Sequence, residues 1–313
     1  MKKPKIMTMG EILVEIMTTQ IDQSFRRPGN LVGPYPSGAP AIFIDQVATL
    51  GIACGIIGCV GDDDFGRNNI ERLAQDGVDI SSIYKLNEHV TGSAFVTYLK
   101  DGTRDFIFNI TNSASGQLSM EHVQEAYFKD CTHFHVMGSS LFSFHIVDAM
   151  TKAIEIVKAQ GGVISFDPNI RKEMLNIPEM REALVLILEY TDIFMPSDHE
   201  IALLTNTNNE ADAIKEILEM GVREIIIKRG KEGCCYYSEK EKIKIPAFKI
   251  NELDPTGAGD CFGATFIACR AKGMDARQAL IYANASGALA VSKKGPMEGV
   301  SSFAELDEFI LKN

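Results

Sequence analysis

The chain has 313 residues, of which 45% are hydrophobic and 23% are charged, and its formal net charge is −11. This acidic balance argues against non-specific nucleic-acid binding, which requires a basic surface. No apolar run approaches the roughly 18 residues that a membrane-spanning helix needs. We therefore expect a globular protein with no nucleic-acid partner and no membrane association.

The N-terminal stretch MKKPKIMTMGEILVEIM is basic and then apolar, a pattern that signal peptides share. Glu11 and Glu15 interrupt the apolar run, and no small-residue cleavage site follows, so the pattern favours a first strand. The seven cysteines are scattered without metal-ligand spacing, which is typical of small buried side chains in a reducing compartment. We therefore expect a cytoplasmic protein.

Strand and helix patterns alternate along the rest of the chain. Residues 53–61 are short, apolar and bounded by glycine, which predicts a buried strand, and residues 64–75 have helical spacing. Further strands are predicted over 132–138, 163–166, 193–195 and 224–228, and further helices over 144–159, 179–190, 210–220, 259–272 and 275–292. Repeated βα units predict an α/β fold with a doubly wound, mostly parallel sheet and helices on both faces.

Two regions break this rhythm. Residues 11–36 are rich in proline and glycine, and residues 91–113 alternate around an Asp101-Gly102 turn, which predicts a hairpin. Paired into a small sheet at the carboxyl ends of the parallel strands, where ligands bind, they would form a lid that excludes water. No linker is visible, so we expect one domain over residues 1–313, and the lid's edge and face would allow a homodimer.

Residues 253–266 read LDPTGAGDCFGATF, a glycine-rich turn before a helix. Such a turn binds anions because backbone N–H groups and the helix dipole point at the ligand. Gly257, Ala258 and Gly259 would form the anion cradle. Asp260 would lie in the first helical turn, where an acid is favoured by about 0.3–1 kcal/mol and stays ionised. It could accept the proton of an alcohol that attacks phosphorus, or it could only cap the helix.

Other glycine-rich motifs fit this stretch less well. The spacing is GxGxxxG rather than GxGxxG, and no ribose-binding acid follows on a strand end, which disfavours a dinucleotide-binding dehydrogenase. No GK[ST] follows, so it is not a P-loop. Asp254, the other carboxylate of the turn, is expected to organise the loop or to contribute to a nearby cation site.

The stretch DPTGAGD resembles the D-x-TGAGD signature of the ribokinase-like carbohydrate kinases, the PfkB family. The resemblance covers nearly the whole chain. Its other landmarks are, in order, SGAPAIFIDQVATLG (37–51), IGCVGDDDFG (57–66), LAQDGVD (73–79), FDPNIR (166–171), the region of Glu200, IKRGKEG (227–233) and YANASGALAVSKKGP (282–296).

The resemblance implies ATP-dependent phosphorylation of a sugar hydroxyl, with Asp260 as the general base. The N–H groups of Gly257, Ala258 and Gly259 would stabilise the transferring phosphoryl group. Glu200 would orient Mg²⁺ through water, since Mg²⁺ keeps most of its waters, and K⁺ is an expected activator. The implied sugar contacts are Glu15, Gly38, Ala39, Asn109, Arg171 and Asp260. The implied nucleotide contacts are Lys228, Gly230, Gly233, Gly257, Gly259 and Asn284.

The sequence departs from the family pattern at several positions. Ser37 and Ile42 stand where the N-terminal signature has Gly and Asn, so the sugar contacts differ from those of many members. Ser197 replaces the Asn of the NxxE motif that ends at Glu200. Pro255 replaces a Ser or Thr and stiffens the turn.

The segment 102–114 resembles the lid hairpin of the 2-keto-3-deoxygluconate kinases, which place an aromatic–Arg pair where this chain has Phe108, Asn109 and Ile110. A sugar acid requires a cation such as a bidentate arginine. The absence of an arginine at the position of Ile110 favours a neutral ketohexose such as tagatose or fructose, recognised by Glu15 and Asn109. A sugar-acid kinase stays open because Arg104 could supply the cation. A catalytically silent sugar- or nucleotide-binding sensor is a further alternative.

Overall fold

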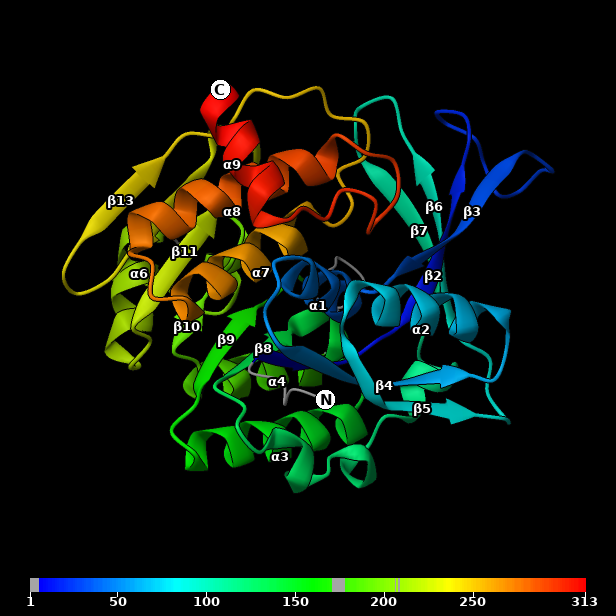
Figure 1. The fold of residues 1–313 in the computed structure, drawn as a ribbon, viewed down its shortest axis with the longest axis horizontal. Coiled ribbons are helices and arrows are strands. Elements are labelled where there is room, and N and C mark those ends of the chain that lie inside the picture. Colours follow the sequence, from blue (N-terminus) through cyan, green and yellow to red (C-terminus); the bar gives the residue numbers. More distant parts are fainter. Residues whose placement is uncertain (1–5, 171–177, 206, 208) are drawn as a thin grey trace.

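The computed structural model describes residues 6–170, 178–205, 207 and 209–313, which form two β-sheets surrounded by helices (Figure 1). The larger sheet has the strand order β13-β12-β11-β10-β9-β8-β1-β4-β5. Its strands are β1 (Ile6–Met9), β4 (Cys54–Gly61), β5 (Asp79–Leu86), β8 (His133–Met137), β9 (Val163–Asp167), β10 (Ile193–Phe194), β11 (Glu224–Lys228), β12 (Cys234–Tyr237) and β13 (Lys242–Ile245).

The strands from β11 to β5 pair in parallel, whereas β12 and β13 extend the sheet in antiparallel fashion. The predicted α/β class with a mostly parallel sheet is therefore confirmed. The sequence analysis missed β5, β12 and β13. The side chains of β5 are largely half-buried, and β13 alternates exposed and buried, so neither strand reads as a continuous apolar run.

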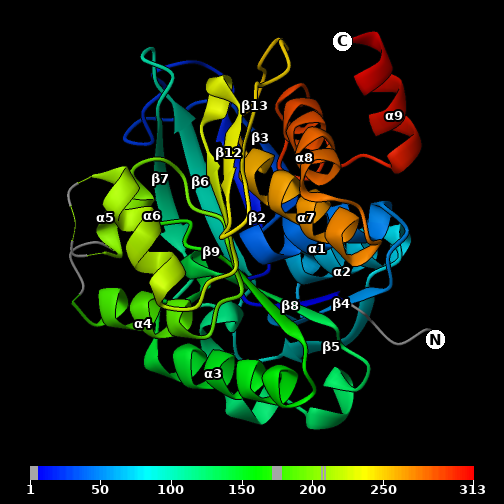
Figure 2. The ribbon, with the colours of Figure 1, turned by 90° about the vertical axis from the view of Figure 1, so that its left-hand side faces the viewer.

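Helices cover both faces of the larger sheet, because consecutive strand side chains point to opposite sides. Ile6 belongs to the same buried cluster as Phe43 and Phe266, whereas the next residue, Met7, belongs to the cluster that contains Ile154. Figure 2 shows the resulting layers, with α3, α4 and α6 on one side and α1, α2, α7 and α8 on the other. The helices are α1 (Ala39–Thr49), α2 (Asp64–Asp76), α3 (Phe144–Ala159), α4 (Pro178–Glu189), α5 (Glu200–Leu203), α6 (Glu210–Glu219), α7 (Ala258–Ala271), α8 (Ala276–Val291) and α9 (Phe303–Lys312).

The smaller sheet is the lid, built from the two insertions that the sequence predicted. Its order is β3-β2-β6-β7, and the strands are β2 (Leu13–Thr18), β3 (Leu31–Ser37), β6 (Gly92–Tyr98) and β7 (Arg104–Asn109). Strands β6 and β7 form the predicted hairpin, with Gly102 in the left-handed region at φ +82°. Along β7, Arg104, Phe106 and Phe108 are half-buried, whereas the residues between them are exposed.

Within the described part of the chain, no helix combines the length and apolar character needed to cross a membrane.

Candidate active site

Two cavities meet at the start of helix α7. The larger, of about 830 Å³, lies beside β11, the segment 246–252 and helix α8. The smaller, of about 430 Å³, lies between the lid, helix α1 and the ends of β9 and β11. Lys228, Pro255 and Gly259 line both cavities, so a ligand in one can touch a ligand in the other at these residues.

Gly257 is the N-cap of α7 and adopts φ +81°, a left-handed conformation that favours glycine. A β-carbon there would lie 2.4 Å from the carbonyl oxygen of Pro296 and 3.2 Å from Cγ2 of Ile42. The first N–H groups of a helix have no partner within the helix, and they carry the positive end of its dipole. The predicted anion cradle therefore lies at the junction of the two cavities.

Asp260 projects from the first turn of α7 and lines the smaller cavity, with 9% of its surface exposed. Its neighbour Gly259 lines both cavities. A carboxylate next to the cradle, with access to the smaller cavity, is placed to accept a proton from a ligand there while the larger cavity holds an anionic group. The residue is thus positioned for the predicted role of general base.

Lys228, at the end of β11, supplies a cation at the same junction. Its Nζ forms an ion pair with Asp167 at the end of β9, and it lies 3.5 Å from the position of a β-carbon on Gly259. Burial alone would lower the pKa of Lys228, but the carboxylates of Asp167 and Glu200 outweigh burial and raise it. The ammonium group is therefore charged beside the cradle.

Glu200 begins helix α5 and is buried with 3% exposure. Its Oε1 accepts a hydrogen bond from the backbone N–H of Ile170 at 2.7 Å, and its Oε2 accepts one from the N–H of Ser197 at 2.6 Å. The side chain thus joins the loops that follow β9 and β10. Each oxygen keeps a second lone pair, which could accept a hydrogen bond from a water.

Asp254 organises the loop before the cradle, one of the two roles that the sequence suggested. It is fully buried, and its carboxylate accepts hydrogen bonds from the N–H groups of Thr256 and Gly295, each at 3.0 Å. Burial, with the nearby carboxylates of Asp254 and Glu15, raises the pKa of Tyr98 on lid strand β6. The phenol therefore stays protonated, and it donates a hydrogen bond to Sδ of Met17 within the lid at 3.3 Å.

The lid supplies the remaining wall of the smaller cavity. Glu15 is buried and accepts a hydrogen bond from the Ser37 hydroxyl at 3.1 Å. Arg104 Nη1 donates to the Thr256 hydroxyl at 2.6 Å, and its guanidinium lies 5.4 Å from the centre of the Phe106 ring. Phe106 stacks on Phe108 with ring centres 5.1 Å apart. These aromatic rings give the cavity an apolar part of its wall.

Asn109 does not line the cavity, contrary to the predicted substrate contact. It is exposed, because successive residues of β7 point to opposite faces and Phe108 occupies the inner one. Sequence reasoning also missed Phe106, Phe108 and Asp167. The period-two alternation of β7 could have identified the two rings together with Arg104, and the FDPNIR landmark contains Asp167.

The other predicted residues divide between the two cavities. Those that line the smaller one are Glu15, Gly38, Ala39, Glu200, Lys228, Gly257, Gly259 and Asp260. Those that line the larger one are Lys228, Gly230, Gly233, Ala258, Gly259 and Asn284. Gly257, predicted to contact the transferring phosphoryl group and the nucleotide, lines the smaller cavity. Arg171 lies outside the described residues.

The predicted anion cradle, a carboxylate and a lysine therefore lie where two cavities meet, an arrangement suited to the transfer of a charged group between two bound ligands. Residues 4–302 match the family model described as pfkB family carbohydrate kinase. The chain therefore belongs to the pfkB family, and it is a sugar kinase. The resemblance seen in the sequence is confirmed, whereas the dehydrogenase alternative is not supported.

Individual relatives agree with this assignment. Fructokinase-2 from Zea mays is 30% identical over 318 residues, covering 98% of this chain and 94% of the relative. The structure of "a putative Ribokinase II" from E. coli in complex with ATP and Mg²⁺ has 61% identity and a TM-score of 0.96, covering 99% of this chain and all of that one. A fructokinase from Xylella fastidiosa with bound ATP has 25% identity and a TM-score of 0.87, covering 98% of each chain.

Proposed function

We propose that this enzyme transfers the γ-phosphoryl group of ATP to a hydroxyl group of a neutral ketohexose, of which fructose is the first candidate. The observation that carries the proposal is the meeting of the two cavities at Lys228 and Gly259, beside Asp260. ATP would occupy the larger cavity with its phosphates at the start of α7, and the sugar would occupy the smaller one. The fructokinase relatives support the choice of sugar.

The chemistry follows from these positions. Asp260 accepts the proton of the sugar hydroxyl while the hydroxyl oxygen forms a bond to the γ-phosphorus. The bond between the γ-phosphorus and the oxygen that bridges it to the β-phosphate breaks, and ADP is released. The N–H groups at the start of α7 and the Lys228 ammonium stabilise negative charge on the transferring group. Because the lid and the aromatic rings of β7 cover the sugar, water is kept from competing as the acceptor.

The described residues fit a Mg²⁺ ion carried mainly by the nucleotide. Among them, no group of three or more His, Cys, Asp or Glu side chains could hold a metal ion. Mg²⁺ commonly uses one or two carboxylates, substrate phosphates and water, and Glu200 could reach such a water through the second lone pair of either oxygen. When bound, the ion would offset charge on the β- and γ-phosphate oxygens. K⁺ is proposed as an activator on the family resemblance, to be tested by exchange with Na⁺.

The charge of the smaller cavity supports a neutral sugar. Four carboxylates and two cations line it, namely Glu15, Asp167, Glu200 and Asp260, with Arg104 and Lys228. Sugar hydroxyl groups can donate hydrogen bonds to such carboxylates, whereas a substrate carboxylate would be repelled. Arg104 nonetheless favours a second candidate, a sugar-acid kinase of the 2-keto-3-deoxygluconate type, because its guanidinium faces the same cavity.

An ADP-release assay with a panel of sugars tests the proposal. We expect turnover with Mg-ATP and fructose or tagatose, and at least tenfold lower kcat/KM with 2-keto-3-deoxygluconate. Preference for the sugar acid would replace the first candidate with the second. Binding of ATP and sugar without turnover on any member of the panel would favour the silent sensor.

We also propose that the chain is a single domain that acts in the cytoplasm, where its seven buried, free cysteines would stay reduced.

A homodimer through the lid is proposed as well, supported by the exposed apolar side chains of Leu31 and Ile107 on the lid strands. Sedimentation of the wild type and of Ile107→Asp would test the dimer. We expect a dimer that the substitution converts to a monomer, and a monomeric wild type would contradict the proposal.

A further inference from the structure

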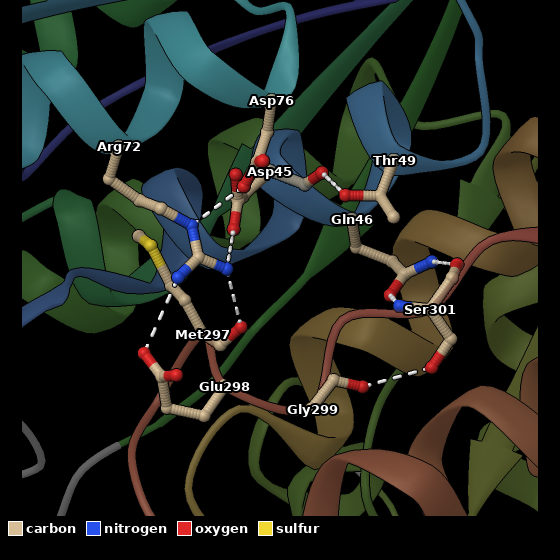
Figure 3. A network of polar contacts seen from close by, with 9 residues as sticks. All are labelled: Asp45, Gln46, Thr49, Arg72, Asp76, Met297, Glu298, Gly299 and Ser301. Carbon is tan, nitrogen blue, oxygen red and sulfur yellow. Dashed lines mark hydrogen bonds and ion pairs between the residues drawn. The ribbon is translucent and has the colours of Figure 1, made fainter.

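Arg72 of helix α2 lies at the centre of a network of hydrogen bonds and ion pairs (Figure 3). Its guanidinium pairs with Asp76 at 2.6 Å, with Asp45 of helix α1 at 3.2 Å and with Glu298 at 3.3 Å. Nη2 also donates to the carbonyl oxygen of Met297 at 2.8 Å. One side chain therefore joins α1 and α2 to the segment that follows α8.

That segment is held a second time, by Gln46 of α1. The Gln46 side chain donates to the carbonyl oxygen of Ser301 at 2.8 Å and accepts from the Ser301 N–H at 2.9 Å (Figure 3). The NH₂ group and the carbonyl oxygen of the Gln46 side chain thus both bind the backbone of Ser301. Residues 295–301, which belong to no helix or strand, are fixed at 297–298 by Arg72 and at 301 by Gln46.

The same segment supports the anion cradle. The N–H of Gly295 donates to Asp254, whose other oxygen holds the Thr256 N–H. The carbonyl oxygen of Pro296 packs against Gly257 so closely that no β-carbon would fit. Residues 295 and 296 therefore pack against the start of α7. They immediately precede Met297 and Glu298, which Arg72 binds.

Helix α1 connects this network to the sugar side of the site. Its N-cap Gly38 and first residue Ala39 line the smaller cavity, and so does Ile42 one turn later. Asp45 and Gln46, the network residues, lie one further turn along the same helix. The N-terminal part of α1 thus lines the smaller cavity. The next turn of the same helix makes the contacts that hold residues 295–301 in place.

We propose that Arg72 is a positioning residue for phosphoryl transfer: through residues 295–298, it sets the distance between the anion cradle on α7 and the sugar wall on α1. Arg72 touches neither cavity, so it acts only through other residues. Loss of its contacts should displace the cradle from the sugar and weaken interactions made in the transition state, with little effect on the binding of either substrate alone.

The test variant is Arg72→Met combined with Asp45→Asn. The single Arg72→Met substitution would leave the Asp45 carboxylate, which is fully buried, without its cation and could prevent folding. The double variant leaves neither charge behind. We expect kcat to fall by roughly 10- to 100-fold, as for a small displacement of reacting groups, while KM for sugar and for ATP changes by less than about threefold.

Arg270→Met is the matched control. Arg270, in the last turn of α7, pairs with Glu224 at 2.8 Å and donates to the Met274 carbonyl oxygen at 2.7 Å. Its side chain is 29% exposed, against 21% for Arg72, but it lies at the far end of the helix from the cradle. We expect comparable loss of thermal stability without the loss of kcat. An equal loss of kcat in both variants would overturn the proposal.

The kinetic measurement rests on the proposed function, so amide hydrogen exchange provides a second readout that needs no substrate. We expect residues 254–259 and 295–299 to exchange faster in the double variant and at the wild-type rate in Arg270→Met. Unchanged exchange in residues 254–259 of the folded double variant would overturn the positioning role. Wild-type protein without sugar turnover would contradict the proposed function instead, and hydrogen exchange would still decide the role of Arg72.

Discussion

The carbonyl oxygen of Pro296 lies 2.4 Å from the position that a β-carbon on Gly257 would occupy. Gly257 also has φ +81°, so two independent constraints require glycine at the N-cap of α7. Any larger residue must push residues 295–296 away or rotate the first turn of the helix, and either movement displaces the anion cradle.

Gly257→Ala should therefore lose both stability and activity. We expect a loss of more than the roughly 1–2 kcal/mol that a left-handed alanine costs, and a decrease in kcat of roughly 10²-fold. Gly273→Ala is the control, because Gly273 has the same φ of +81° but no atom within 4 Å of its β-carbon position. Thermal unfolding and ADP release measure the two effects. Equal behaviour of the two variants would contradict the steric argument.

Asp260→Asn should remove the proton acceptor while leaving the cavity shape unchanged. The expected decrease in kcat is roughly 10²- to 10⁴-fold, the usual contribution of a general base. Calorimetric titration with ATP should give a dissociation constant close to that of the wild type, since Asp260 lines the smaller cavity. A variant with near-normal turnover would rule out Asp260 as the base.

Lys228→Met should destabilise the protein because it leaves the buried carboxylate of Asp167 without its ion-pair partner. Breaking such a pair costs about 3–5 kcal/mol. Adding Asp167→Asn should restore most of the free energy of unfolding, measured in urea, without restoring turnover. If the double variant regains both stability and activity, the Lys228 ammonium has no role in phosphoryl transfer.

His135 should make the protein less stable in acid. It is fully buried, it stacks on Phe43 with ring centres 3.8 Å apart, and its Nδ1 lies 2.8 Å from the Ser165 hydroxyl. Burial, reinforced by the charge of Lys228, holds its pKa well below the usual value. The unfolded chain therefore binds a proton near pH 6.5 that the folded protein does not bind.

The contribution of His135 is accordingly complete above about pH 6.5 and decreases below it, by up to about 1.4 kcal/mol per pH unit. Urea unfolding between pH 8 and pH 5 should show this slope in the wild type and a shallower slope in His135→Gln. Burial raises the pKa of Asp45, and this has the opposite effect on the pH dependence of stability. Because Asp45 is present in both proteins, its effect cancels when the two slopes are subtracted. Identical slopes would exclude His135 as the source.

Phe108→Ala and Asn109→Ala should separate the two faces of the lid. Phe108 lines the smaller cavity, whereas Asn109 is exposed on the other face of β7. We expect Phe108→Ala to raise KM for the sugar by roughly 10-fold or more, from the loss of an aromatic contact, and Asn109→Ala to change it by less than about twofold. A larger effect at Asn109 would restore the prediction made from the sequence.

Local patterns were sufficient for much of the fold and for the cradle. The apolar run 53–61 and the helical spacing of 64–75 appear as β4 and α2 within a residue or so. The glycine turn before α7 is equally local, because the helix start and its free N–H groups depend only on neighbouring residues. The position of Asp260 beside the cradle therefore follows from the residues next to it in the chain.

Features that depend on distant pairing could not be read in this way. The face occupied by Asn109 depends on the register of β7 against β6, where Ser93 pairs with Asn109 and Ala94 with Phe108. The Lys228–Asp167 pair joins residues 61 positions apart and requires β9 and β11 to flank β10. Neither the strand order nor the register can be deduced from the spacing of neighbouring residues in the sequence.

The two cavities are built from different parts of the chain. Every residue that lines the larger cavity follows residue 227, whereas the lid and α1 walls of the smaller cavity come from residues 13–108. Substitutions in the first third of the chain can therefore alter the choice of acceptor sugar without touching the phosphoryl donor's pocket. Acceptor specificity can diverge within such a scaffold while donor use stays the same, and the shared residues Lys228 and Gly259 are the positions at which a change would affect both substrates.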